Sequence, residues 1–98
     1  PAFLPNEFLT AAHPVFLPQD QVLIFPNPVS DSLTIEALTQ EMHPPFEVKI
    51  WSADGREVLE TLLPQNAGSV DVSRLTDGVY FLQLTDQHRA AVVKFVKE

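Results

Sequence analysis

Residues 78–98 read GVYFLQLTDQHRAAVVKFVKE, which has the period-two pattern of two β-strands joined by a short polar turn. In residues 78–84 both faces of the predicted strand are largely apolar, so this strand is expected to lie at the centre of a sheet. The last strand, residues 91–96, continues almost to residue 98 and carries lysines near its end. Chain termini commonly fray. Because an apolar strand so near the end is unusual, we interpret this tail either as part of the core or as a segment that a partner recognises.

Upstream of this pair, the same alternation predicts five more short strands, at residues 22–25, 33–37, 46–50, 57–63 and 68–72. Turn signals separate them, such as Asp54-Gly55, which supplies the positive φ angles of a hairpin turn. No stretch has convincing helical periodicity. The pattern predicts an all-β fold, a seven-stranded antiparallel β-sandwich that is immunoglobulin-like but lacks the Cys–Trp–Cys core of antibody domains. A small barrel is the alternative.

Residues 1–21 differ from the rest, because Pro1, Pro5, Pro14 and Pro18 interrupt short apolar clusters. Proline this dense prevents a regular helix or a central strand. We predict a proline-rich extended lead or linker over residues 1–21 and one domain over residues 22–98. The apolar side chains of the lead either cover the edge or end of this domain or dock on a preceding one. A first residue that is not Met suggests a processed or excised piece, with any signal peptide upstream.

Composition disfavours several classes of protein. A net charge of −7, from 6 basic and 13 acidic residues, disfavours partners such as nucleic acid and anionic lipid. The chain has no cysteine, which excludes disulfides, thiolate catalysis and cysteine zinc sites. No apolar run approaches the roughly 20 residues of a membrane-spanning helix.

Candidate catalytic and metal-binding residues have simpler explanations. His13, His43 and His88 lack metal-ligand spacing and are expected in exposed loops. Ser30-Asp31-Ser32 fits a turn that enters a strand, and Asp54-Gly55 lacks the other ligands of a calcium loop. A catalytic triad assembled from distant positions stays open, although no local signature of one is present. We predict that the chain is not an enzyme and has no catalytic, metal or cofactor-binding residues and no cofactor.

A second function class is a non-catalytic β-sandwich module that binds glycan or a surface partner. Trp51 and Tyr80 are the candidate stacking residues. Trp51 lies on the polar phase of its strand, so it is either exposed or packed between elements. This alternative predicts affinity for a polysaccharide and an exposed aromatic cluster around Trp51, although the convergent polar groups of a binding site cannot be located in the sequence.

Four motifs, in order over residues 22–98, resemble the type A C-terminal sorting domain of the type IX (Por) secretion system of Bacteroidetes. The motifs are Phe25-Pro26-Asn27-Pro28 with residues 30–35, residues 48–51 with Asp54-Gly55-Arg56-Glu57-Val58, residues 71–75 with residues 78–82, and Lys94-Phe95-Val96-Lys97. The sequence departs from the family at Arg74 and Thr76, where small residues or proline are usual, and in the turn at residues 86–89, which lacks the usual glycine.

The resemblance implies a secretion and sorting signal that directs a covalently linked N-terminal cargo protein through the outer-membrane type IX translocon. It implies transit through the periplasm, partners such as the translocon and its shuttle proteins, removal by a sortase, and a final location at the outer-membrane surface or in the medium. By position, the residues that the machinery reads are Gly78, Tyr80, Leu82, Leu84, Lys94, Phe95, Val96 and Lys97.

The residues themselves offer a physical reason for such a role. A last strand at the edge of a sheet has unpaired backbone groups, which a receptor can extend by adding a strand. Lys94 and Lys97 would discourage self-association at that edge. We therefore hypothesise that the tail is a recognition strand.

Overall fold

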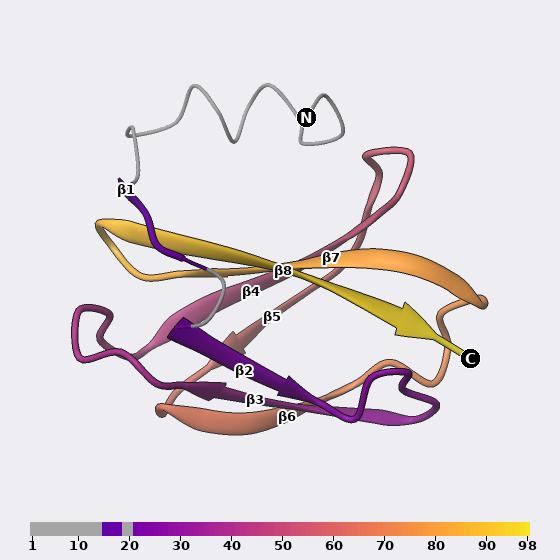
Figure 1. Ribbon diagram of the computed structural model, residues 1–98, viewed down its shortest axis with the longest axis horizontal. Coiled ribbons are helices and arrows are strands. Elements are labelled where there is room, and N and C mark those ends of the chain that lie inside the picture. Colours follow the sequence, from indigo (N-terminus) through magenta and orange to yellow (C-terminus); the bar gives the residue numbers. More distant parts are fainter. Residues whose placement is uncertain (1–14, 19–20) are drawn as a thin grey trace.

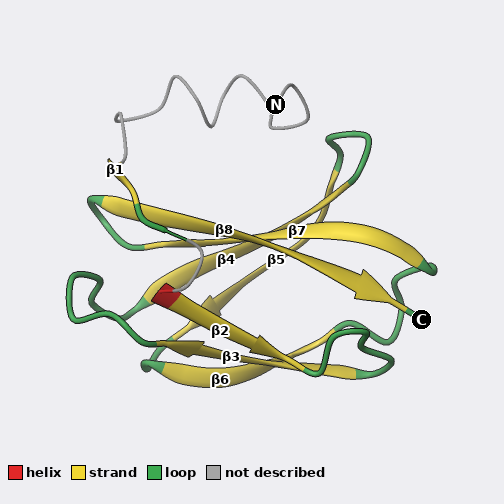
Figure 2. Cartoon of the chain, in the orientation of Figure 1, coloured by secondary structure: helices red, strands yellow, loops and turns green. Residues whose placement is uncertain are grey.

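The computed structural model describes residues 15–18 and 21–98, and nearly all regular structure in them is β-strand (Figure 2). Among these residues only Gln21 is helical, and its N–H donates to the carbonyl of Pro18 (3.1 Å). The strands are β1 (Val15–Phe16), β2 (Val22–Phe25), β3 (Ser32–Ala37), β4 (Phe46–Ser52), β5 (Glu57–Leu63), β6 (Ala67–Asp71), β7 (Gly78–Thr85) and β8 (Arg89–Lys97). The described ranges contain no helix with the length and apolarity needed to cross a membrane.

The strands form two sheets stacked as layers (Figure 1). One has the order β1-β8-β7-β4-β5 and the other the order β2-β3-β6. All pairs from β2 onward are antiparallel, whereas β1 pairs with β8 in parallel. The all-β, sandwich-like prediction with seven strands from residue 22 is confirmed, with bounds within two residues of those expected. The central place of β7, between β8 and β4, is confirmed as well.

The short strand β1 was not predicted, and it lies inside the proline-rich segment. It occupies the sheet edge beside β8, where Val15 pairs with Arg89 and Phe16 with Ala90. Edge pairing requires hydrogen bonds on one side only, so nearby prolines are tolerated there. This part of the segment therefore covers a sheet edge, one of the two alternatives for the lead. Residues 1–14 and 19–20 lie outside the described residues.

The core lies between the two sheets and follows the period-two pattern. Leu33 and Ile35 of β3 face Phe46, Val48 and Ile50 of the larger sheet, and all five are fully buried. Burial of each such side chain stabilises the fold by about 1.5–3 kcal/mol. β7 and β8 contribute Leu82, Leu84 and Phe95 to the same core. The last strand is therefore anchored by its inward side chains.

The hairpin between β4 and β5 is closed by contacts within its own turn. Gly55 has a φ of 89°, the left-handed region that glycine adopts at little cost. The N–H of Ser52 donates to the carbonyl of Arg56 (2.8 Å), and that of Gly55 to the carbonyl of Ser52 (2.9 Å). The Ser52 hydroxyl donates to the Asp54 carboxylate. This bond, followed by the one from the Arg56 backbone N–H, lowers the pKa of the Asp54 carboxyl. The predicted hairpin turn is confirmed.

Candidate functional site

The predicted recognition residues lie on two neighbouring strands, β7 and β8. Their register places Gly78 opposite Lys97, Tyr80 opposite Phe95, and Leu84 opposite Ala91. The rings of Tyr80 and Phe95 are stacked with centroids 5.7 Å apart. Tyr80, Leu82, Leu84 and Phe95 are buried, so in the folded domain they hold β8 in place rather than face a partner.

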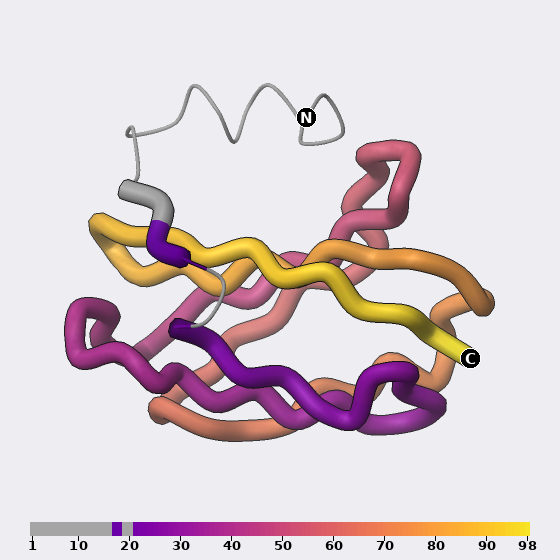
Figure 3. The backbone as a smooth tube through the Cα atoms, viewed as in Figure 1, coloured from indigo at the N-terminus to yellow at the C-terminus, as the bar shows by residue number. Residues whose placement is uncertain are grey.

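A latch, which we define as residues Asn27 to Val29, closes the outer edge of β8 at its C-terminal end. The side-chain oxygen Oδ1 of Asn27 accepts a hydrogen bond from the N–H of Val96 (2.9 Å). Val29 donates its N–H to the carbonyl of Val96 (2.9 Å) and accepts from the N–H of Glu98 (2.8 Å). The Val29 side chain is 1% exposed. The Pro26-Asn27-Pro28 motif therefore binds the tail, and Figure 3 shows the two segments meeting near the C-terminus.

A second contact covers the beginning of the same edge. After β1, the N–H of Leu17 donates to the carbonyl of Ala90 (2.9 Å). The chain then crosses to the other sheet as β2 and returns to β8 at Val29 (Figure 1). β8 is therefore held at both ends of its outer edge by segments on either side of β2.

The two tail lysines have different environments. Lys94 is exposed, as expected for an edge residue. Lys97 is 6% exposed, and its Nζ donates to the main-chain oxygen of Glu98 (3.3 Å). The expectation that both lysines guard an open edge is wrong for Lys97, because its inward register position and the latch bury it.

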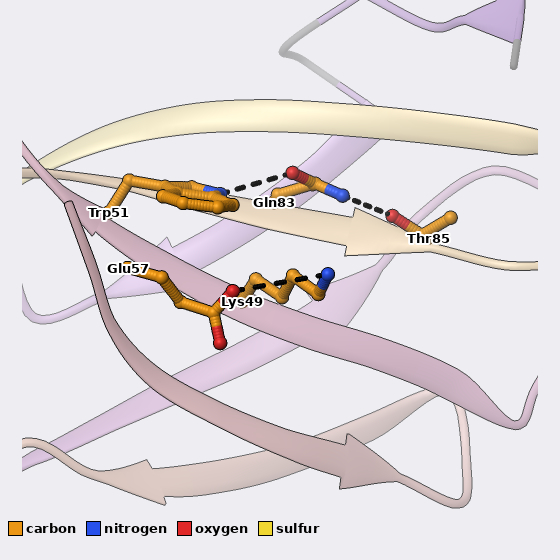
Figure 4. A network of polar contacts seen from close by, with 5 residues as sticks. All are labelled: Lys49, Trp51, Glu57, Gln83 and Thr85. Carbon is orange, nitrogen blue, oxygen red and sulfur yellow. Dashed lines mark hydrogen bonds and ion pairs between the residues drawn. The ribbon is translucent and has the colours of Figure 1, made fainter. Parts of the chain in front are cut away.

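Trp51 does not form an exposed aromatic cluster. It is 3% exposed, and its Nε1–H donates to Oε1 of Gln83 (3.1 Å), whose Nε2 donates to Oγ1 of Thr85 (3.0 Å) (Figure 4). Lys49 of β4 and Glu57 of the adjacent strand β5 form an ion pair, with 3.9 Å between Nζ and Oε1. Tyr80 is 5% exposed, and its hydroxyl donates to the carbonyl of Thr76 (2.7 Å). The expected exposed platform of the glycan alternative is therefore contradicted.

Two predicted loop histidines lie beside an open cavity of about 510 Å3 between the loop before β4 and the turn before β8. His43 and His88 line it together with Asp86, whose carboxylate accepts hydrogen bonds from the backbone N–H groups of His43 (3.0 Å), His88 (2.8 Å) and Arg89 (2.7 Å). Burial raises the pKa of Asp86, but these bonds outweigh it and hold the pKa below its ordinary value. Asp86 thus fastens one loop to the other.

Metal ligands do not gather at this cavity. Within residues 15–18 and 21–98, no three His, Cys, Asp or Glu side chains are grouped so that they could hold a metal ion. His13 lies outside the described residues. Asp31 of the Ser30-Asp31-Ser32 turn accepts, through its carbonyl, the N–H of Val72 (2.8 Å), which links the turn to the end of β6.

The fold and the held tail define a small β-sandwich module built around its last strand. The family model for the secretion system C-terminal sorting domain matches residues 23–98, and the chain belongs to this family. It is a sorting signal of type IX secretion, which implies export to the outer-membrane surface or the medium.

A solved structure shows the same fold. PorZ is described as an essential bacterial surface component of the type-IX secretion system of the human oral-microbiomic Porphyromonas gingivalis. It matches with a TM-score of 0.60 and 24% sequence identity over 81% of this chain. The chain spans only 12% of the length of PorZ. The comparison with curated proteins found no match.

Proposed function

We propose that residues 22–98 are a non-catalytic sorting domain that carries a covalently linked N-terminal cargo protein to the type IX translocon. The cargo crosses the periplasm, meets shuttle proteins and the translocon at the outer membrane, and is released when a sortase cuts within the lead, residues 1–21. Membership of the sorting-domain family supports this route.

The observation that supports the proposal is the way β8 is held on its inner side and exposed at Lys94. Buried side chains and β7 fix the strand from inside, whereas Lys94 points to solvent. Of the predicted recognition residues, Gly78 and Lys94 are exposed, and Lys94 is the one of the two with a side chain for direct contact. Half-buried Val96 lies beside Lys94 on the same face. Tyr80, Leu82, Leu84 and Phe95 are positioning residues, and Gly78 and Lys97 secure the end of the β7–β8 pair.

We also propose an immunoglobulin-like relationship for the sandwich. The support is its chain path, in which the first segments leave the larger sheet, form the edge strand β2 of the smaller one and return to the last strand. Two stacked antiparallel sheets with such connections are typical of that architecture.

A secretion assay tests the function. Residues 1–98 are fused to a reporter in a bacterium that has this secretion system, beside a fusion that lacks Lys94 to Glu98. We expect the complete domain to bring the reporter to the surface or the medium and the truncated domain to leave it in the periplasm. Normal export of the truncated fusion would refute the role of the tail.

A further inference from the structure

The outward-facing backbone groups of β8 can be assigned from the hydrogen bonds at its two ends. The N–H and C=O groups of Val96 bond to the latch, and the C=O group of Ala90 bonds to Leu17. These groups point away from β7. Because alternate residues of a strand direct their N–H and C=O groups to the same side, Val92 and Lys94 also direct theirs away from β7.

Residues 91–95 therefore form a gap in the covering of this edge, which we call the edge window. Among residues 15–18 and 21–98, no hydrogen bond reaches the outward groups of Val92 and Lys94. At about 3.3 Å per residue, the window is roughly 13 Å long. A row of unpaired N–H and C=O groups is a template for one further strand.

Resting on the proposed function, we propose that the edge window binds one short extended segment of a partner protein, with an acidic side chain opposite Lys94. Backbone hydrogen bonds to Val92 and Lys94 supply the affinity, as in other cases of strand addition. The positive charge of Lys94 gives selectivity for an acidic side chain in the partner. Lys94 is exposed and forms no ion pair within the described part of the chain, whereas Lys49 is paired with Glu57.

Two further features favour a partner over a second copy of this chain. Each copy has a net charge of −7, so two copies repel each other on approach. Pairing of two edge windows would also bring two lysines to the same small surface, where like charges oppose association. An acidic segment of another protein would instead meet the exposed positive charge of Lys94.

The decisive comparison is Val92→Pro against Val92→Ala in the reporter fusion. Both variants lose the valine side chain, but only proline removes the outward N–H, and it leaves the β7 ladder intact. We expect export of the proline variant to be at least tenfold below that of the alanine variant, from a lost hydrogen bond and the bulk of the ring. Equal thermal unfolding of the two purified fusions verifies that both fold.

Charge is tested with Lys94→Glu against Arg74→Glu, which changes the net charge equally at the exposed turn before β7. We expect about fivefold lower export for Lys94→Glu than for Arg74→Glu, the effect of about 1 kcal/mol at a partly exposed contact. Equal export of the two variants would contradict the acidic partner.

The outcomes separate the edge window from the sorting role. If truncation of Lys94 to Glu98 blocks export but the proline and alanine variants are exported equally, the tail functions and the edge window is wrong. If truncation has no effect, the role of the tail fails as well. If Val92→Pro abolishes a dimer on gel filtration while export stays equal to that of Val92→Ala, the occupant is a second copy, and the proposal is overturned.

Discussion

The turn at Ser52 to Arg56 and the latch at Asn27 to Val29 each contain residues of a predicted sorting-domain motif, yet their polar groups bond over very different sequence distances. In the turn, the hydrogen bonds that join Ser52, Asp54, Gly55 and Arg56 to one another span no more than four positions. In the latch, the Asn27 side chain bonds to a residue 69 positions away. The contacts of the turn therefore fix local geometry, whereas those of the latch close the whole domain.

The largest contrast is expected from Val29→Ala in the latch. Val29 is 1% exposed, so loss of its two methyl groups should lower the free energy of unfolding by about 2–3 kcal/mol. Thermal and urea unfolding measure this loss of free energy. The substitution should also accelerate amide hydrogen exchange more at Val96 and Glu98 than at Arg56. If exchange quickens equally in the hairpin, the latch does not act on the tail in particular.

Gly55→Ala should be the next largest change, and it should act in the hairpin. A φ of 89° strains any residue with a Cβ, so we expect a loss of about 1–2 kcal/mol in unfolding free energy. Gly55→Asn is the matched control, because asparagine tolerates left-handed geometry better. The hydrogen-exchange rate of the Val96 amide should rise only as much as the loss of global stability requires. A larger rise at Val96 would contradict the local character of this turn.

Asn27→Ala removes one hydrogen bond from the latch and should lower the free energy of unfolding by about 1 kcal/mol. The N–H of Val96 should then exchange faster in NMR measurements, whereas Asn27→Asp, which keeps an acceptor oxygen, should preserve its protection. Unchanged protection of Val96 in the alanine variant would mean that the Val29 contacts alone close this end.

The smallest expected effect is that of low pH, which should weaken the turn at Ser52 to Arg56 but not the latch. Because the pKa of Asp54 is lowered in the folded chain, its charged form contributes stability above its ordinary pKa, and this is lost as pH falls through the lowered value. In an NMR titration, the amide of Arg56 should shift with the protonation of Asp54 while that of Val96 should not. Asp54→Asn should abolish the shift, and its persistence would assign the titration to another group.

The success of sequence reasoning follows the same division between local and distant contacts. Residues 22–25 and 57–63 were predicted as strands with the observed bounds, since alternation and turn residues are local signals. The turn at Asp54-Gly55 was predictable for the same reason. β1 and the latch were not, because a parallel edge pair and an Asn27–Val96 bond leave no periodic trace in the sequence.

The burial of individual side chains was also not predictable where it depends on residues distant in the sequence. Trp51 has the polar phase of its strand, and nothing local indicates that Gln83, 32 residues away, meets its Nε1–H. The burial of Lys97 likewise depends on Val29. The predicted recognition residues lie on the two strands expected for them, but which of these residues face solvent is decided by neighbours distant in the chain.

The 69-residue separation between Asn27 and Val96 also bears on when the domain can finish folding. Contacts between distant residues form late, because a long loop must close before they contribute stability. Here the closing partners are an early segment and the final strand, so the sandwich stays incomplete until residues 96–98 have arrived. Closure of the latch therefore requires that the chain be present through the end of β8.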